Sequence, residues 1–179
     1  MLASLHQDHL NISRLLTVLD RVITDIDDER PVRYQLVRDV LNYMTNVSDV
    51  YHHPKEDIIY EYYVVYRTDD VCPVTKELTQ QHTLIVEQGN SLLELINMVL
   101  MDAVIPLDKV KSELKQYIEL QRSHLDYEEA IVFPILRKAM TEDDWRNLEQ
   151  NWSQKTVEDP LFGPEISETY KDLHQQLLH

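Results

Sequence analysis

The stretch Asp49-Val-Tyr-His-His-Pro-Lys-Glu-Asp-Ile-Ile59 decides how the rest of the chain is interpreted. It places two histidines and two acids within six residues of a segment whose apolar residues recur with helical spacing. In an uninterrupted helix, His52 and Glu56 are four residues apart, so their side chains leave one face about 5–6 Å apart. Such a pair can bind one metal ion. Whether the site has more ligands depends on the histidines and acids in the rest of the chain.

Pro54 lies between these two residues and is the obstacle to this interpretation. Inside a helix it removes one hydrogen bond and clashes with the carbonyl of Val50, at a cost of ~3 kcal/mol. The residues on both sides of it nevertheless keep one helical phase, within a face about 120° wide. This face contains Leu41, Met44, Ser48, His52, Glu56, Ile59 and Tyr63. We therefore predict a kink rather than a break at Pro54, and likewise at Pro134.

Composition and charge exclude several classes of protein. The 179 residues include only 2 glycines and 7 prolines, which favours long helices and an all-α fold. The 17 basic and 32 acidic side chains give a net charge of −15, which repels nucleic-acid phosphates and anionic lipid headgroups. We expect no nucleic-acid partner and no membrane partner. A lone cysteine, Cys72, and the lack of a signal sequence or an apolar span predict a cytoplasmic protein.

Helical periodicity predicts four long helices joined by short loops, which must form an antiparallel up-down-up-down four-helix bundle over residues 1–140. The predicted helices cover about residues 2–28, 31–66, 74–100 and 107–140, with a turn at 68–73. Residues 141–179 form a helical tail that packs on the bundle or extends from it. Within this tail we expect one short helix from Asp143 to about Trp152 and another from Glu165 to Leu178.

Histidines and acids recur at equivalent places on the four predicted helices. Each helix carries one inward-looking histidine, and the second and fourth helices add a glutamate four residues later. His9 and His82 are 73 residues apart, and His52 and His124 are 72 apart, so the two halves of the chain repeat. An antiparallel bundle brings these side chains together at its centre, where they suit two metal ions bridged by two carboxylates. The six candidate ligands are His9, His52, Glu56, His82, His124 and Glu128.

Several neighbours of these ligands are candidates for supporting roles. Metal-bound imidazoles usually donate their second N–H to a carboxylate or carbonyl, so His53, Asp57 and Glu129 are expected around the ligands or else on a solvated face. His6, one turn before the first ligand, is either a spare ligand or an exposed residue at the end of the bundle.

Two further residues on the predicted metal-facing side have alternative explanations. Tyr63 belongs to a cluster of tyrosines. Its hydroxyl lies near the metal, or else the cluster forms part of the apolar core or of a dimer surface. Gly89, two turns after His82, opens a path for a small ligand or allows close helix packing. Both alternatives stay open at the level of sequence.

The motifs His-His-x-Lys-Glu-Asp at 52–57 and His-x-x-x-Glu-Glu at 124–129 each follow a helix with a lone histidine. In this the chain resembles the hemerythrin-like, or HHE cation-binding, family over about residues 1–140. The resemblance implies an oxo- or hydroxo-bridged di-iron centre with the four histidines as terminal ligands and Glu56 and Glu128 as bridges. Val86 follows His82 by four residues and stands where oxygen-carrying hemerythrins have a second histidine on the third helix. The four-His, two-Glu set is most similar to di-iron proteins of the iron-sulfur centre repair type.

Three functions are compatible with this resemblance. The leading hypothesis is a protein that binds or senses a diatomic gas, O2 or NO, rather than a classical enzyme. The alternatives are an iron-handling protein of iron-sulfur cluster repair or stress, and a protein-interaction bundle with a structural metal. Imidazole and carboxylate also suit manganese or zinc, so iron itself follows from the resemblance. Ferritin-like bundles are rejected because they need Glu-x-x-His on two helices and a lone Glu on the others; a homodimer stays open.

Overall fold

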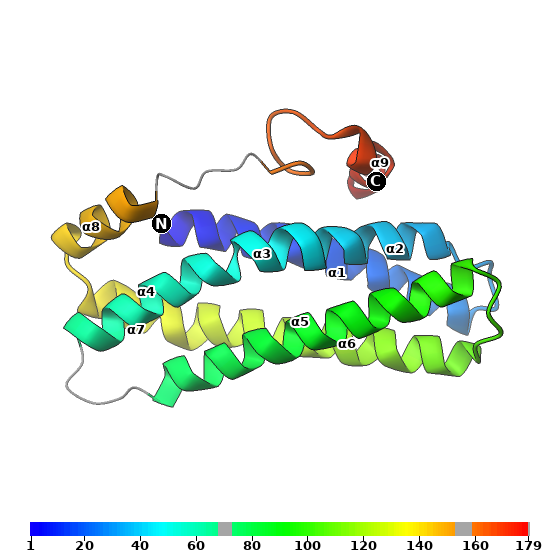
Figure 1. Ribbon diagram of the computed structural model, residues 1–179, viewed down its shortest axis with the longest axis horizontal. Helices are drawn as coiled ribbons and strands as arrows, with labels where there is room; N and C mark the ends of the chain where they lie inside the picture. Colours follow the sequence, from blue (N-terminus) through cyan, green and yellow to red (C-terminus); the bar gives the residue numbers. More distant parts are fainter. Residues whose placement is uncertain (68–72, 153–158, 179) are drawn as a thin grey trace.

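Four antiparallel helical segments form the molecule, whose computed structural model describes residues 1–67, 73–152 and 159–178. The chain runs up and down through these segments in order, so the predicted all-α bundle is confirmed (Figure 1). The segments consist of α1 (Leu2–Asp27), then α2 (Tyr34–Tyr43), α3 (Asp49–Tyr51) and α4 (His53–Tyr66), then α5 (Pro73–Leu100), and finally α6 (Leu107–Tyr127) and α7 (Phe133–Ala139). Of the turn predicted at 68–73, residues 68–72 with Cys72 lie outside the described residues, and Pro73 is the first residue of α5.

The second helical segment bends at Pro54 but keeps its helical course, as predicted. His52, where α3 gives way to α4, has φ −79° and ψ −60°, which are right-handed helical values. The N–H of Glu56 donates to the carbonyl of His52 at 3.3 Å, and the N–H of His52 donates to the carbonyl of Ser48 at 2.8 Å. These two bonds keep His52 and Glu56 one helical turn apart, as the metal-site prediction requires.

Two π-helical turns were not predicted. Residues Met44–Ser48 form one before the Pro54 bend, and residues Glu128–Val132 form the other, which ends two residues before Pro134. A π turn closes its hydrogen bonds over five residues rather than four, and such turns are frequent at functional sites. Their side chains show helical periodicity like their neighbours, so the sequence carries no signal that separates a π turn from an α turn.

The bundle core is divided into two apolar clusters by a layer of buried polar residues. The larger cluster fills the end where α2 meets α5, and includes Leu16, Leu41 and Leu92. The smaller cluster fills the opposite end and includes Leu5 and Phe133. Along α1, His9 lies between Leu5 of one cluster and Ile12 of the other. The predicted ligands therefore sit where apolar packing excludes water on two sides.

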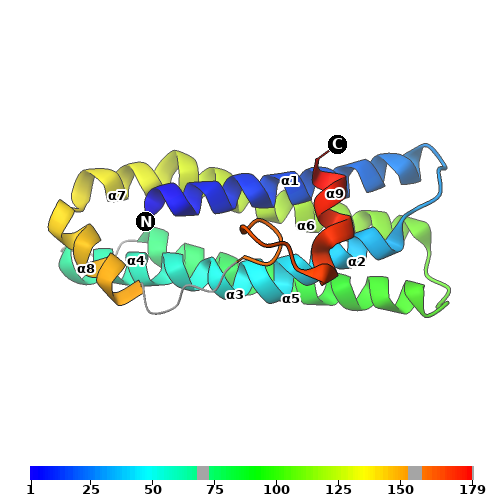
Figure 2. The same cartoon turned by 90° about the horizontal axis from the view of Figure 1, so that it is seen from above.

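The tail packs against the bundle at two places. Helix α8 (Glu142–Trp152) begins one residue before the predicted Asp143. At its start the N–H of Thr141 donates to Asp144 Oδ2 at 2.7 Å, and the N–H of Asp144 donates to Thr141 Oγ1 at 3.3 Å. Helix α9 (Lys171–Leu177) crosses α1 and α2 (Figure 2) and buries Leu173 in the larger cluster.

The second tail helix begins later than predicted. The prediction from Glu165 was wrong, because helical structure starts only with a 3-10 turn at Glu168–Tyr170. The residues before it form a loop around Asp159, whose Oδ1 accepts bonds from the N–H groups of Leu161 and Phe162 at 2.8 and 2.9 Å. The N–H of Ser167 also donates to the carbonyl of Pro160 at 2.8 Å, so this loop continues past Glu165 to the 3-10 turn.

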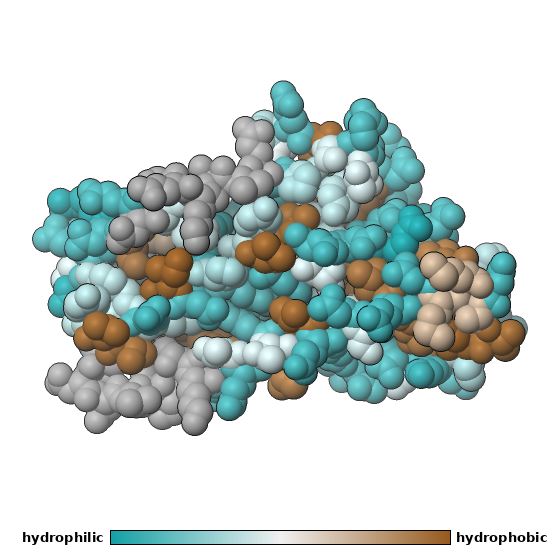
Figure 3. Space-filling view, viewed as in Figure 1, coloured by the Kyte–Doolittle hydropathy of each residue, from teal (hydrophilic) through white to brown (hydrophobic). Residues whose placement is uncertain are grey.

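The surface shown in Figure 3 is mostly hydrophilic, with apolar side chains gathered at the end of the bundle where α5 passes into α6. Met98, Met101 and Val104 are among the exposed apolar residues there. Within the described residues, no helix combines the length and the apolar character that crossing a membrane requires.

Candidate metal centre

The structure brings all six predicted ligands together at the middle of the bundle. The two glutamates have no exposed surface, and each of the four histidines is buried. Two overlapping groups have their candidate ligand atoms within 4.8 Å of one another. One group is His9, His52, Glu56 and Glu128, and the other is Glu56, His82, His124 and Glu128. The two carboxylates are common to both groups.

Glu56 faces a different set of histidines with each of its oxygens. Its Oε1 lies 3.2 Å from Nε2 of His9 and 3.2 Å from Nε2 of His52. Its Oε2 lies 3.4 Å from Nε2 of His82. Glu128 also spans the two groups, because its Oε2 lies 3.3 Å from Nε2 of His9 and 3.4 Å from Nε2 of His124. This is the arrangement of two carboxylates placed between two cation positions.

Each of the four histidines directs Nε2 inward and Nδ1 toward an outer side-chain oxygen. An Nδ1–H donated outward leaves the Nε2 lone pair free for a cation, which is the tautomer a metal ligand needs. The Nδ1 pairs are His9 with Glu129 at 2.8 Å, His52 with Asp8 at 3.5 Å, His82 with Asp57 at 3.1 Å, and His124 with Gln81 at 3.0 Å.

These outer partners repeat between the two halves of the chain. Asp57 and Glu129, which the sequence singled out, each follow one of the two shared glutamates and contact the lone histidine of the other half. Asp8 and Gln81, which it missed as partners, each precede a lone histidine and contact the next histidine along the chain. The local likeness of the sequences around His9 and His82 was the signal that could have found them.

Tyr60 is a further residue of the site that sequence reasoning missed. Its hydroxyl donates to Oε1 of Glu128 at 2.7 Å, and its side chain is only 3% exposed. Tyr63, for which the sequence left open a place near the metal, in the apolar core or on a dimer surface, is half-buried against the smaller apolar cluster. Tyr60 follows Glu56 by four residues, so the same helical spacing that pairs His52 with Glu56 could have identified it.

The donor atoms fit a cation because several of them have no partner of their own. Glu56 Oε2, His82 Nε2, His124 Nε2 and Glu128 Oε2 are buried atoms without a hydrogen bond within the described part of the chain. A buried polar group left unpaired costs about 1–3 kcal/mol. A cation between the imidazole nitrogens and the carboxylate oxygens would satisfy all four atoms at once.

The pKa values of the ionisable groups in the metal-free site also favour the binding of a cation. Burial acts to lower the pKa of His9, but hydrogen bonds with Glu128 and Glu56 and their charges raise it to about 10. Burial also acts to lower the pKa of His52, but the charge of Glu56 and the hydrogen bond with Asp8 raise it to about 9. Burial also acts to raise the pKa of Glu56, yet the neighbouring imidazoles hold it well below its usual range. The site therefore keeps its carboxylates ionised and attracts positive charge.

Two open alternatives from the sequence can be compared with the structure. An added Cβ on Gly89 would lie 3.0 Å from Thr45 Cγ2 and 3.3 Å from Tyr117 Cε2, so this glycine serves close helix packing. The side chain of His6 is 51% exposed, and its Nδ1 lies 2.9 Å from Oε1 of Glu129. His6 therefore shares the outer carboxylate of His9 and lies outside the two ligand groups.

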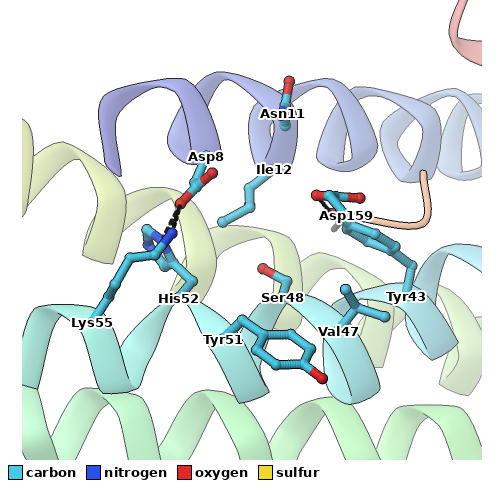
Figure 4. Close-up of a pocket in the computed structure, with 10 residues that line it drawn as sticks. All are labelled: Asp8, Asn11, Ile12, Tyr43, Val47, Ser48, Tyr51, His52, Lys55 and Asp159. Carbon is cyan, nitrogen blue, oxygen red and sulfur yellow. Dashed lines mark hydrogen bonds and ion pairs between the residues drawn. The ribbon is translucent and has the colours of Figure 1, made fainter. Parts of the chain in front are cut away.

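A cavity of about 100 Å³ lies between α1 and the second helical segment, on the outer side of His52 (Figure 4). Lys55 Nζ and Asp8 Oδ2 form an ion pair at 3.1 Å on its wall. A volume of this size admits a few water molecules or a small ligand. The lining residues are Asp8, Asn11, Ile12, Tyr43, Val47, Ser48, Tyr51, His52, Lys55 and Asp159.

A four-helix bundle with a buried, symmetric set of histidines and shared glutamates has the architecture of a cation-binding domain. Residues 1–136 match the family model described as the hemerythrin HHE cation binding domain. The chain therefore belongs to the hemerythrin HHE cation-binding family, as its motifs indicated. A comparison with curated proteins gives no match. The nearer likeness to the iron-sulfur centre repair type stays a prediction.

Proposed function

We propose that this chain is a cytoplasmic non-haem di-iron protein that binds or senses O2 or NO. The observation that carries the proposal is the position of Glu56, whose two oxygens face two different sets of histidine nitrogens. Glu128 also lies between the two sets, although one oxygen, Oε2, faces both His9 and His124. A carboxylate between two histidine pairs suits a bridge between two ions rather than a ligand of one.

The donor count supports the binding of a small external ligand. His9 and His52 with one oxygen of each glutamate provide four donors on one side, and His82 and His124 provide the same on the other. Iron in such carboxylate and imidazole sites takes more than four ligands, which leaves positions open. Iron bound there would supply those positions and a change of oxidation state.

The protein groups around the site have defined tasks under this proposal. Asp57 and Glu129 accept the Nδ1–H of His82 and His9 and so fix which ring nitrogen faces the ions. Tyr60 donates to Glu128 and limits the rotation of that carboxylate. The apolar clusters on both sides exclude bulk water, which strengthens the electrostatic interactions inside.

An iron-handling role is the second candidate, and the carboxylates of the cavity favour it. Asp8 and Asp159 both line the space outside His52, and the chain carries a net charge of −15. An acidic approach attracts cations. The two functions separate when the reduced, iron-loaded protein is mixed either with O2 or NO, or with an apo iron-sulfur protein. Rapid spectral change with the gas supports the leading proposal, whereas iron transfer without a gas-dependent change supports the alternative.

The direct test is metal analysis of the isolated protein together with its ultraviolet-visible spectrum with and without azide. We expect close to two irons per chain, near-ultraviolet absorption of an oxo-bridged diferric site, and a new band with azide. His52→Leu should reduce the iron content and abolish the azide band. His174→Gln in the tail, whose Nδ1 bonds the carbonyl of Leu161, is the matched histidine control. Less than about one metal per chain, with no change in His52→Leu, would refute the proposal.

A further inference from the structure

Lys55 is a charged residue beside the proposed centre that has no task in it. Its near neighbour His53 is buried and packs by stacking its ring on that of His82, at a centroid distance of 4.1 Å. Lys55 makes polar contacts instead. Its side chain is 18% exposed, and its Nζ donates to Asp8 Oδ2 at 3.1 Å. The ring of Trp152, at the end of α8, lies 5.7 Å from the same Nζ, within the range of a cation–π contact. A carboxylate of α1 and a ring of the tail thus hold this ammonium group in place.

Asp8 accepts two donors with one oxygen atom. Figure 4 shows the ammonium group of Lys55 and the ring of His52 both beside its carboxylate. Asp8 Oδ2 lies 3.1 Å from Lys55 Nζ and 3.5 Å from His52 Nδ1. The Nδ1 contacts of the other three proposed histidine ligands are 2.8, 3.1 and 3.0 Å long. His52 therefore has the longest and weakest outer hydrogen bond of the four.

A shared acceptor does not by itself produce such a long contact. Glu129 Oε1 is also shared, and it lies 2.9 Å from Nδ1 of His6 and 2.8 Å from Nδ1 of His9. At Asp8 the second donor is an ammonium group, which is a compact, full positive charge. The charge of Lys55 therefore attracts the carboxylate of Asp8 more strongly than the N–H of His52 does.

This competition affects the metal site. A carboxylate that accepts the outer N–H of a metal-bound imidazole makes the ring a better donor to the metal. Lys55 opposes this effect, because it neutralises Asp8 and occupies the oxygen that His52 needs. We propose that Lys55 is a positioning residue that acts through Asp8 to lower the affinity of the His9 and His52 position for a cation. This inference rests on the proposed two-ion centre and goes beyond it by naming a residue that makes a bound ion easier to release.

A structural role is the alternative, in which Lys55 and Asp8 only connect α4 to α1. Loss of such a contact would leave metal affinity unchanged or lower it, because the ligands would be held less firmly. Under the proposal, loss of the Lys55 charge raises metal affinity. The sign of the change therefore separates the two roles.

The test is anaerobic competition between the protein and a chelator for iron(II), which gives the overall constant for binding two ions. We expect this constant to rise about tenfold in both Lys55→Gln and Lys55→Met, at the low end of the range for changes around metal ligands. Lys55→Arg keeps the charge and should resemble the wild type. Lys115→Gln, on the exposed face of α6, removes the same charge near Asp27 and should leave the constant unchanged. Circular dichroism of each variant checks its helix content.

Asp8→Asn shows whether Lys55 acts through this carboxylate. Asp8→Asn alone should lower the constant, and in its background Lys55→Gln should cause a smaller rise than in the wild type. An equal rise in both backgrounds overturns the action through Asp8. An unchanged or lower constant in Lys55→Gln and Lys55→Met, with two ions bound by the wild type, overturns the role of Lys55 and leaves the two-ion centre intact. Fewer than two ions per wild-type chain overturn the centre and this inference with it.

Discussion

The substitution Tyr60→Phe removes one hydroxyl and tests whether hydrogen bonds to the proposed bridging carboxylates determine metal retention. The Tyr60 hydroxyl donates to Glu128 Oε1 at 2.7 Å in a fully buried environment. A hydrogen bond to a charged group contributes about 1.5–3 kcal/mol. We expect the free energy of unfolding of the metal-free protein to fall by that amount. Because Glu128 is proposed as a bridge, metal affinity should also fall about 10–100-fold, as is usual when a ligand's hydrogen-bond partner is lost.

The matched control is Tyr43→Phe, which removes the hydroxyl that donates to Asp159 at 2.6 Å, outside the ligand groups. Urea unfolding of both metal-free variants measures the loss of stability, and competition with a chelator measures metal affinity. Both variants should lose stability, but only Tyr60→Phe should lose metal more readily than the wild type. Equal metal retention in the two variants would refute the role assigned to Tyr60.

Three further predictions follow from the same structure. The pKa values of His52 and His9 are raised to about 9 and 10 in the metal-free fold, against about 6.5 unfolded. Their stabilising effect is full below about pH 6.5 and is lost as pH rises through 9–10. The unfolding free energy of the metal-free protein should therefore fall between about pH 6.5 and 10, and that of the metal-loaded protein should fall less. An identical pH dependence of the two forms would contradict this. Asp57→Asn should weaken metal binding about 10–100-fold in chelator competition, while Glu94→Gln on the exposed face of α5 should not. Gly89→Leu should lower the thermal midpoint far more than Gly89→Ala, whose Cβ needs only a small shift of Thr45 and Tyr117; similar midpoints would refute close packing there.

The bundle and the position of its candidate ligands could be predicted because both depend on helical periodicity. Apolar residues at helical spacing define the helices, and the 72–73-residue repeat places the histidines at equivalent depths. The phase argument at Pro54 also held, because Pro54 lies in the first turn of α4, where its missing N–H costs no helix hydrogen bond, and His52 before it keeps helical φ and ψ values. Local spacing was sufficient for these features.

The features that sequence reasoning missed depend on contacts between distant segments. Asp8 and Gln81 accept Nδ1–H from histidines more than forty residues away. The local likeness around His9 and His82 marks the two positions as equivalent, but it does not specify which histidine each one contacts. The late start of the final helix depends on Asp159, which binds the backbone of Leu161 and also accepts the hydroxyl of Tyr43 from another helix. A single sequence shows helical faces well but does not show which side chains meet across them.

The most direct test of the two-ion centre is an anaerobic titration of iron(II) into the metal-free protein. Calorimetry monitors the titration, and iron analysis of the product gives the number of ions bound per chain. The wild type should bind two iron ions per chain. Glu56→Gln should bind one or none, because its two oxygens face different histidine pairs, while Glu61→Gln on the exposed side of α4 should still bind two. Saturation of the wild type at one ion, or two ions retained in Glu56→Gln, would contradict a carboxylate-bridged pair.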